Sequence, residues 1–536
     1  MTQTAARTHF DPAGIDQIFA AVDQCGQPGA AVAIAIDGVP VYRRGFGLAN
    51  MELPVLLGPG MRMRIGSTTK HFTALAYLLL CEEGRAAIDD PVGAHIGEIH
   101  AASRDVTMRQ LMGHTSGIRD AMAVSMLTNG TGVPVGDADL LRYYQTIADV
   151  DFAPGTSWSY NNGGYVLLTA AIERITGETL DDVLRTRIFE PVGMFDTRLR
   201  RWDTDFVPNS ATLHFRRADG RFTRDYMGSE ISGAGGIVST MDDMLRWLRH
   251  MDAPTVGSAE SWRLMRAPHT LENGSSTGYG LGLVIGRYRG VETLSHGGGV
   301  MAGNSQMIKV PAAGLDISIA VNRADVSAAE LANRVIDACV ADLAPVVTAP
   351  HPPCDAVFVS PREGRVIELA THGDMQLMAI DGAPGLPVTA DAGGNLNLPD
   401  IMSFIRQSAR VEGHSLVFTE FGAEIALERI ATQPDARLGD RAGSFESAAV
   451  GARARLSETA GEARLTIAGA HGVADYRLTP ISDTIWKASA LGPFGMLGGI
   501  VTFAPDRSGF ALASGRMKGL RFARSSGQGE IAAASR

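Results

Sequence analysis

Ser67 and Lys70 stand three residues apart, where an apolar segment with helical spacing begins. Residues three apart share one face of a helix. A lysine amine that has lost its proton can take the proton of the serine hydroxyl, and the helix N-terminus favours the anion that forms. A helix-capping serine beside a solvated lysine is the alternative interpretation. The spacing favours a nucleophilic serine with a lysine beside it and leaves the structural role open.

Lysine is rare in this chain, so each lysine is of interest. Only four of the 48 basic residues are lysine, and the rest are arginine. Arginine keeps its proton in proteins, whereas a buried lysine can lose it. The other three lysines, Lys309, Lys487 and Lys518, have no serine three residues before them. Because the segment Phe72–Cys81 is apolar, we expect Lys70 to start a helix inside the domain.

A second motif, Tyr160-x-Asn162, also precedes an apolar helical segment. This spacing can place a phenol and an amide side by side. A tyrosinate near an ammonium group has a lowered pKa and can act as a base, while the asparagine can hold a substrate carbonyl. The alternative is a turn with local asparagine hydrogen bonds, which is common for Asn-Asn-Gly-Gly. Alone, the motif does not decide between them.

A third motif, His296 followed by three glycines, ends one expected strand and precedes another. Glycines without side chains let a substrate backbone lie along the strand edge. Gly298 and Gly299 are therefore candidate substrate-binding residues, and the N–H of Gly299 can form an oxyanion hole with that of Ser67. A glycine-rich hairpin with a surface histidine is the alternative.

The elements that must position these motifs follow a simple order. Ala30–Ile36 and Val39–Phe46 are expected strands joined by an Asp-Gly turn. Helical patterns dominate from about 67 to 252, strands return over Tyr279–Asn322, and a helix is expected over Ser327–Leu343. Strands at both ends of the segment predict an antiparallel sheet closed by the two ends, with helices packed on it.

The rest of the chain reads as two small all-β domains. Pro345–Pro353 is proline-rich and is expected to be a linker after a catalytic domain at 1–345. Short strands separated by Gly, Asp and Asn turns fill 354–430 and 441–526. Each has the length of a small β-barrel or sandwich; both are expected to be barrel-like, and the second lipocalin-like.

Taken in this order, Ser-x-x-Lys, Tyr-x-Asn and His-x-Gly resemble the serine β-lactamase and penicillin-binding protein family. The resemblance covers about residues 10–345. It implies an α/β catalytic domain, an α+β sandwich of antiparallel sheet and helices, that works through an acyl-enzyme. Ser67 would attack, Lys70 and Tyr160 would jointly move protons, Asn162 would position substrate, and His296 would sit on the facing strand. Four further stretches resemble the family: Leu111–Gly117, Phe189–Met194, Gly233–Ser239 and Tyr279–Leu283.

Departures from the family pattern narrow the expected reaction. His296 replaces a lysine and is mostly neutral at pH 7, which weakens a grip on a substrate carboxylate. A catalytic domain with two β domains resembles the D-aminopeptidase branch, where an acidic loop of the last barrel meets the substrate amine. The comparable stretch here, Leu491–Gly499, is apolar and has no carboxylate. We therefore expect a peptidase or amidase of small linear or modified peptides, cleaving beside a D-residue. Linearised microcystin, the substrate of a similar hydrolase, is one example. A D-aminopeptidase or a carboxylesterase is the alternative.

Composition limits the other function classes. The net charge is −10 with a pI near 5.7, and no basic run is present, so nucleic-acid binding is not expected. Four scattered cysteines predict free thiols. The first residues lack a signal-peptide pattern and the longest apolar helix is too short to span a bilayer, so a cytoplasmic protein without membrane contact is expected. The sequence does not decide the oligomeric state, and a homodimer is possible.

Two other classes fit the residues less well. A metal hydrolase would need a pattern such as His-Glu-x-x-His, but His95 and His100 flank Glu98 at other spacings. We expect no metal and no cofactor. A catalytically silent scaffold would not need the full set of motif residues.

Overall fold

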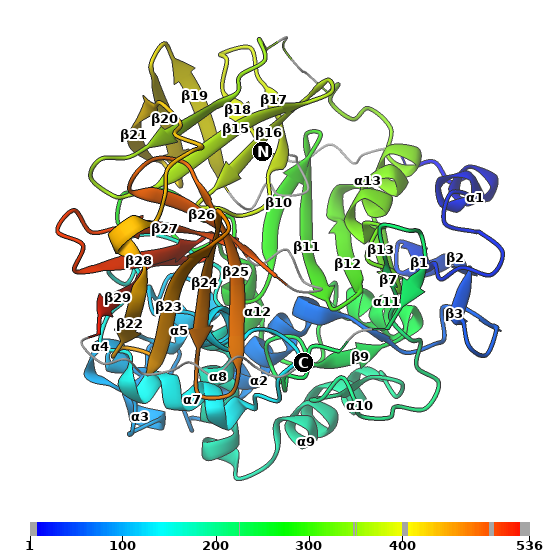
Figure 1. Cartoon of the computed structure of the whole chain (residues 1–536). Helices are drawn as coiled ribbons and strands as arrows, with labels where there is room; N and C mark the ends of the chain where they lie inside the picture. Colours follow the sequence, from blue (N-terminus) through cyan, green and yellow to red (C-terminus); the bar gives the residue numbers. More distant parts are fainter. Residues whose placement is uncertain are drawn as a thin grey trace.

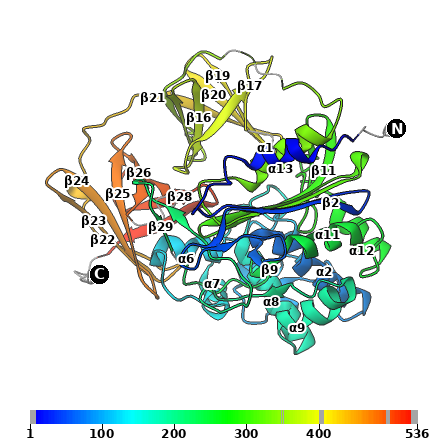
Figure 2. The same cartoon turned by 90° about the vertical axis from the view of Figure 1, so that its right-hand side faces the viewer.

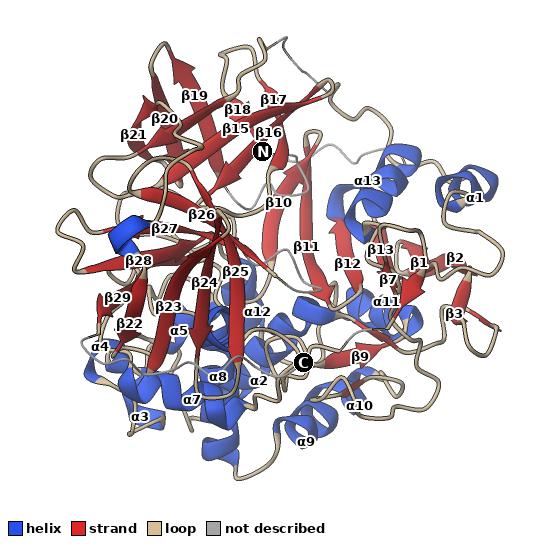
Figure 3. Cartoon of the chain, in the orientation of Figure 1, coloured by secondary structure: helices blue, strands red, loops and turns tan. Residues whose placement is uncertain are grey.

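A computed structural model describes residues 8–224, 226–346, 349, 351–398, 406–491 and 498–525. They form a mixed α/β domain and two closed β-barrels, called here the first and second barrel in chain order (Figure 1). Helices gather in the α/β domain, while the barrels are almost entirely strand (Figure 3). This confirms the fold class expected from the sequence.

The central sheet of the α/β domain is antiparallel, and both ends of the domain contribute to it. Each residue of the first strand pairs with the last strand, from Ala30 opposite Val321 to Ile36 opposite Leu315. The order across the sheet is β10 (Val284–Tyr288), β11 (Val291–Val300), β12 (Gly303–Val310), β13 (Leu315–Val321), β1 (Ala30–Ile36) and β2 (Val39–Phe46).

Helices cover both faces of this sheet, which explains why its first strand is apolar throughout. Alternate residues of a strand point to opposite faces. Val32 and Ile34 pack with helices α1 and α13, whereas Ala31 and Ala33 pack toward α2 and α11. Figure 2 shows the first pair of helices on one side of the sheet and the second pair on the other. Small alanines on the second face let α11 lie close to the sheet, and α2 packs in the same core.

The helices begin and end close to the expected positions. The last one ends at Cys339 rather than Leu343, because Val340 turns to an extended conformation and pairs with Thr8. The helices are α1 (Pro12–Phe19), α2 (Lys70–Glu82), α3 (Val92–His95), α4 (Ala101–Arg104), α5 (Met108–Met112), α6 (Ala121–Asn129), α7 (Asp137–Thr146), α8 (Asn162–Thr176), α9 (Leu180–Leu184), α10 (Glu190–Val192), α11 (Met241–His250), α12 (Ala259–Arg266) and α13 (Ala328–Cys339). Short strands complete the domain: β3 (Leu48–Asn50), β4 (Val55–Leu56), β5 (Met63–Arg64), β6 (Arg198–Leu199), β7 (Phe215–Arg216), β8 (Phe222–Thr223) and β9 (Ile237–Ser239).

Each barrel closes by pairing its last strand with its first, β21 with β14 and β29 with β22. The first barrel comprises β14 (Ala356–Val359), β15 (Val366–His372), β16 (Met375–Ile380), β17 (Leu386–Ala390), β18 (Leu396–Asn397), β19 (Gln407–Glu412), β20 (Ser415–Glu420) and β21 (Ala423–Ile430). The second comprises β22 (Gly443–Ser447), β23 (Ala452–Thr459), β24 (Glu462–Ala468), β25 (Val473–Pro480), β26 (Ile485–Ala490), β27 (Gly498–Phe503), β28 (Gly509–Ser514) and β29 (Met517–Arg524).

The barrels pack on the α/β domain and on each other. Phe421 of the first barrel lies in one buried cluster with Trp158 and Tyr279. The Tyr476 hydroxyl of the second barrel donates to the Leu127 carbonyl of α6 at 2.9 Å. Between the barrels, an apolar cluster is flanked by an ion pair that joins Lys487 to Glu368. No helix in the described part of the chain is long and apolar enough to cross a membrane.

Candidate active site

All three parts of the molecule line one cavity of about 820 Å³. The α/β domain supplies Ser67, Tyr160, Asn162, His296, Gly298 and Gly299. The first barrel adds residues such as Gln407 and Phe421, and the second barrel adds residues 514–518. Every candidate site residue named from the sequence therefore either lines this cavity or, in the case of Lys70, contacts residues that do.

Ser67 reaches the cavity because the chain makes a tight turn just before α2. Gly66 has φ +52°, a left-handed conformation that favours glycine, and it opens a short 3₁₀ turn over Gly66–Thr69. A Cβ on Gly66 would lie 2.9 Å from the Gly299 carbonyl oxygen, and one on Gly298 would lie 1.9 Å from the Ile65 carbonyl oxygen. Two glycines thus allow the Ser67 turn to lie directly against β11.

Lys70 is fully buried, and its amine has three oxygen neighbours. Its Nζ lies 3.2 Å from Ser67 Oγ, 2.8 Å from Asn162 Oδ1 and 2.7 Å from the Ala234 carbonyl oxygen. Burial, assisted by the charge of Arg516, lowers the pKa of Lys70 well below its ordinary value. A neutral amine has two N–H donors and one lone pair. The amide and carbonyl oxygens only accept, so they take the donors and leave the lone pair for the serine hydroxyl.

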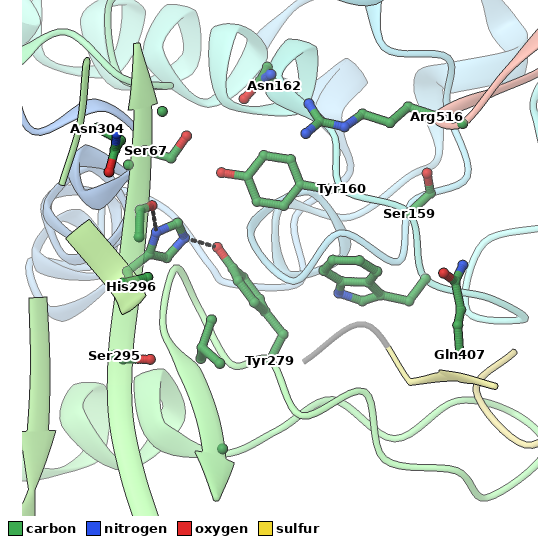
Figure 4. A pocket seen from close by; sticks show the side chains of 18 of the residues that line it. Ser67, Ser159, Tyr160, Asn162, Tyr279, Ser295, His296, Asn304, Gln407 and Arg516 are labelled. Atoms are coloured by element: carbon green, nitrogen blue, oxygen red, sulfur yellow. Dashed lines mark hydrogen bonds between the residues drawn. The ribbon is translucent and has the colours of Figure 1, made fainter. Parts of the chain in front are cut away.

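The Tyr160 ring lies beside Lys70, and its hydroxyl is directed toward Ser67 (Figure 4). The Lys70 Nζ is 4.6 Å from the ring centroid. Burial raises the pKa of Tyr160 above that of an ordinary phenol, although the Ser67 hydroxyl and the charge of Arg516 act against it. The lowered pKa of Tyr160 expected from the sequence is therefore wrong, because burial dominates.

Asn162 is held by the first turn of α8. The backbone N–H groups of Asn162 and Gly163 donate to the carboxylate of Asp120, at 3.0 and 2.9 Å. The same carboxylate accepts from the N–H of Met122 at the start of α6. Asp120 thereby fixes two helix N-termini to each other and sets the place of the Asn162 amide, which contacts Lys70.

His296 is buried in the wall of the cavity as a neutral imidazole. Its Nδ1 lies 2.6 Å from the Gly297 carbonyl oxygen, which can only accept, so Nδ1 carries the proton. Its Nε2 then accepts from the Tyr279 hydroxyl at 2.8 Å. Burial and the nearby Lys70 lower the pKa of His296 to about 3. The ring contacts neither Ser67 nor Lys70 by a hydrogen bond, so it orders this wall through Tyr279.

Gly298 and Gly299 lie where β11 runs past the end of its neighbour. Strand β10 pairs with β11 only as far as Val284 opposite Ser295. Beyond that point one edge of β11 has no strand partner among the described residues, and it faces the cavity. A free strand edge offers backbone donors and acceptors to an extended substrate. The Gly299 N–H as an oxyanion donor stays a prediction.

Sequence comparison identifies the family to which this site belongs. The profile of the beta-lactamase family matches residues 15–340, which is more than half of the chain. The chain belongs to the beta-lactamase family. It is a serine hydrolase, and the resemblance noted from the motifs is confirmed.

Within this family, curated relatives are D-aminopeptidases. The chain is 29% identical to the enzyme of Gluconobacter oxydans over 412 residues, 75% of this chain and 74% of the relative. It is 31% identical to that of Brucella anthropi over 280 residues, about half of each chain.

Solved structures of the family share the fold. The octameric penicillin-binding protein homologue from Pyrococcus abyssi matches 78% of this chain and all of its own, with a TM-score of 0.56 and 21% identity. The D-amino acid amidase from Ochrobactrum anthropi SV3 matches 61% of this chain and 97% of its own, with a TM-score of 0.52 and 23% identity.

Several residues of this beta-lactamase family site were not singled out from the sequence. His114 and Tyr279 lie inside stretches that resemble the family, and both pack beside the Tyr160 ring. Asp120 and Arg516 had no motif to mark them. Arg516 enters from the turn between β28 and β29, not from the apolar stretch Leu491–Gly499. Residues 492–497 of that stretch, including Phe494 and Met496, lie outside the described residues.

Proposed function

We propose that this enzyme is a peptidase or amidase that cleaves small linear or modified peptides beside a D-residue, through an acyl-enzyme on Ser67. One observation carries the proposal: the buried Lys70 amine lies within hydrogen-bond distance of Ser67 Oγ, Asn162 Oδ1 and the Ala234 carbonyl oxygen. Once the amine has lost its proton, the two oxygens that only accept take its two donors, and its lone pair can take the Ser67 proton. This is the arrangement that a general base needs at neutral pH.

The reaction then follows from the groups around the cavity. Ser67 Oγ attacks the substrate carbonyl carbon while its proton passes to Lys70 Nζ. Tyr160, a protonated phenol directed toward Ser67, is suited to hand a proton to the leaving nitrogen. Asn162 holds the substrate amide, and the N–H groups of Ser67 and Gly299 face the developing oxyanion. Water activated by the same groups would release the acyl product.

The D-residue preference rests on relatives rather than on geometry. The curated relatives are named D-aminopeptidases, and the one from Gluconobacter oxydans matches across three quarters of this chain. The cavity, at about 820 Å³, has room for several residues of a peptide. Linearised microcystin, a peptide with D-alanine and a bulky apolar side chain, is one candidate substrate.

The test uses a linear N-acetylated peptide with an internal D-Ala–Leu bond, its L-Ala twin, and mass spectrometry of the products. We expect wild type to cleave the D-peptide at that bond and Ser67→Ala to cleave neither. Cleavage only of D-alanyl amides with a free amine would replace the proposal with an aminopeptidase. A covalent adduct on Ser67 from a serine-reactive acylating probe would show that the nucleophile is competent in either case.

A carboxylesterase is the second candidate, because the same acyl-enzyme machinery cleaves esters more easily than amides. The matched D-Ala ester and D-Ala amide decide between the two. Turnover of the ester with no detectable turnover of any amide would identify an esterase.

A further inference from the structure

Arg516 places a positive charge beside the catalytic residues. It stands in the two-residue turn between β28 and β29, where Ser514 pairs with Met517. Its guanidinium carbon lies 5.0 Å from the centroid of the Tyr160 ring. Figure 4 shows the side chain extending from the second barrel toward Tyr160 and Asn162. The guanidinium therefore faces the same space as Ser67.

The donors of this guanidinium are unused within the described part of the chain. A guanidinium has five N–H donors arranged to match a carboxylate. Among the described residues Arg516 makes a contact with the Tyr160 ring but no hydrogen bond and no ion pair. By contrast, Arg365, another arginine of the cavity wall, is paired with Asp381 and Glu420.

Asp120, a buried carboxylate beside the Asn162 backbone, is not free to pair with Arg516. Asp120 is 2% exposed, and its two oxygens already accept the backbone N–H groups of Met122, Asn162 and Gly163. The catalytic lysine does not supply an anion either. Arg516 instead makes this part of the cavity electropositive, so it suits a negatively charged group.

The turn that carries Arg516 is fixed to the α/β domain. Arg119 Nη1 donates to the Lys518 carbonyl oxygen at 2.7 Å, and the Lys518 N–H donates to Asp151 Oδ1 at 2.9 Å. Arg119 is itself buried and paired with Asp149 and Asp151. On the barrel side, the neighbouring Met517 is buried in the core. Both contacts hold the residues that follow Arg516, which fixes the place from which its side chain starts.

From these contacts we infer that Arg516 binds a carboxylate of the substrate, placed a few bonds from the scissile carbonyl. The inference rests on the proposed acyl-enzyme function and specifies its substrate class: N-acylated acidic peptides rather than peptides with a free amine. A free ammonium group at this place would be repelled by the positive charge of the guanidinium. An arginine pairs with a carboxylate through two parallel N–H···O bonds, which gives it preference over a neutral group of equal size.

The experiment compares three D-Ala–Leu peptides that differ only in the N-acyl group: succinyl, its neutral amide succinamoyl, and the cationic 4-aminobutanoyl. We measure kcat/KM for each at a pH on the activity plateau. Wild type should prefer the succinyl peptide over the succinamoyl peptide by about tenfold to a hundredfold. Raised salt should reduce this preference if the pair is partly exposed.

Variants assign the preference to Arg516. Arg516→Gln should bring the acidic-to-neutral ratio close to one, and Arg516→Glu should shift preference to the aminobutanoyl peptide. Arg521→Gln is the matched control, because it removes the same charge from an exposed position further along β29 and should keep the wild-type ratio.

The outcomes separate the inference from the proposed function. An equal loss for all three peptides in Arg516→Gln would overturn carboxylate binding, since it would mean that Arg516 acts only through the pKa of Lys70. A wild-type ratio near one would overturn it too, with the peptidase function intact. No cleavage of any peptide by a folded wild-type enzyme would instead count against the proposed function.

Discussion

Two walls of the cavity face each other and differ in how their polar groups are satisfied. The wall from the α/β domain carries Lys70, Asn162 and Asp120, each held by several hydrogen bonds. The wall from the second barrel presents Arg516 and Lys518, whose side chains lie over the rings of Tyr160 and Phe152. The polar groups of the first wall form their hydrogen bonds within the protein. The positive charges of the second wall are available to a bound substrate.

In the proposed mechanism the residues of the first wall carry out the reaction and those of the second wall select the substrate. Groups that perform proton transfer need fixed neighbours, because a general base works only within hydrogen-bond reach of its proton. Groups that recognise a substrate need unused donors that the substrate itself will satisfy. Changes on the first wall should therefore affect every substrate, and changes on the second should affect some substrates more than others.

The largest expected effect is at Lys70. Lys70→Gln removes the lone pair that faces Ser67, and kcat should fall by about a thousandfold for all peptides. Lys487→Gln is a matched control, because Lys487 forms an ion pair between the barrels. Its kcat should stay within about twofold of wild type. Steady-state kinetics with thermal melting to confirm folding tests both. A Lys70→Gln enzyme with a tenth of wild-type activity would exclude Lys70 as the main base.

A smaller loss is expected at Asp120, a positioning residue. Asp120→Asn weakens the acceptors for the Asn162 and Gly163 N–H groups and should reduce kcat by about tenfold to a hundredfold. A purely structural role would leave the pH profile in place. Because the Asp120 charge raises the pKa of Lys70, its removal should move the acid limb of kcat/KM to lower pH. An unmoved limb in a folded variant would contradict this role.

The pH profile itself should show one limb. In the proposed mechanism Lys70 acts as a neutral amine, so kcat/KM should fall about tenfold per pH unit below its lowered pKa and stay level above it. Since the pKa of Tyr160 is raised, no alkaline fall is expected up to pH ~10. Removing the Arg516 charge in Arg516→Gln should move the acid limb to higher pH, opposite to Asp120→Asn. Two shifts in the same direction would break the electrostatic argument.

The smallest effect is expected at Arg119, which holds the turn that carries Arg516. Arg119→Gln loses the bond to the Lys518 carbonyl and should reduce the preference for the succinyl peptide by about threefold, through a looser Arg516. Activity on the succinamoyl peptide should change less. Arg119→Lys, which keeps a charged donor, should recover part of the preference. An equal fall in activity on all peptides would instead mean that Arg119 supports the residues of the first wall.

The sequence predicted that the residues of the first wall lie together, because they carry local motifs. Ser67 and Lys70 are three apart on one helix, and Tyr160 and Asn162 flank a helix start, so spacing alone sets most of their geometry. The strands β1 and β2 have the bounds expected from the apolar run and its Asp-Gly turn. What spacing could not give was burial, and burial reverses the expected direction of the Tyr160 pKa.

The second wall could not be predicted, since no local sequence pattern encodes it. Arg516 is one of many arginines, and its approach to Tyr160 depends on how a whole barrel docks. The bond that fixes its turn joins residues 399 positions apart in the chain, Arg119 and Lys518. Lysine scarcity gave a partial signal: Lys70, Lys309 and Lys487 make ion pairs or buried hydrogen bonds, and Lys518 lines the cavity.

The closed second barrel also bears on how the enzyme is made. Its last strand, β29, pairs with its first, β22, and the turn before β29 completes the cavity. During synthesis the α/β domain can fold as soon as β13 has paired with β1. The ribosome must then produce about two hundred further residues before the cavity gains its third wall. A nascent or C-terminally clipped chain would hold the nucleophile without its selectivity, so proteolysis near the end of the chain would change what the enzyme accepts before it changes whether it reacts.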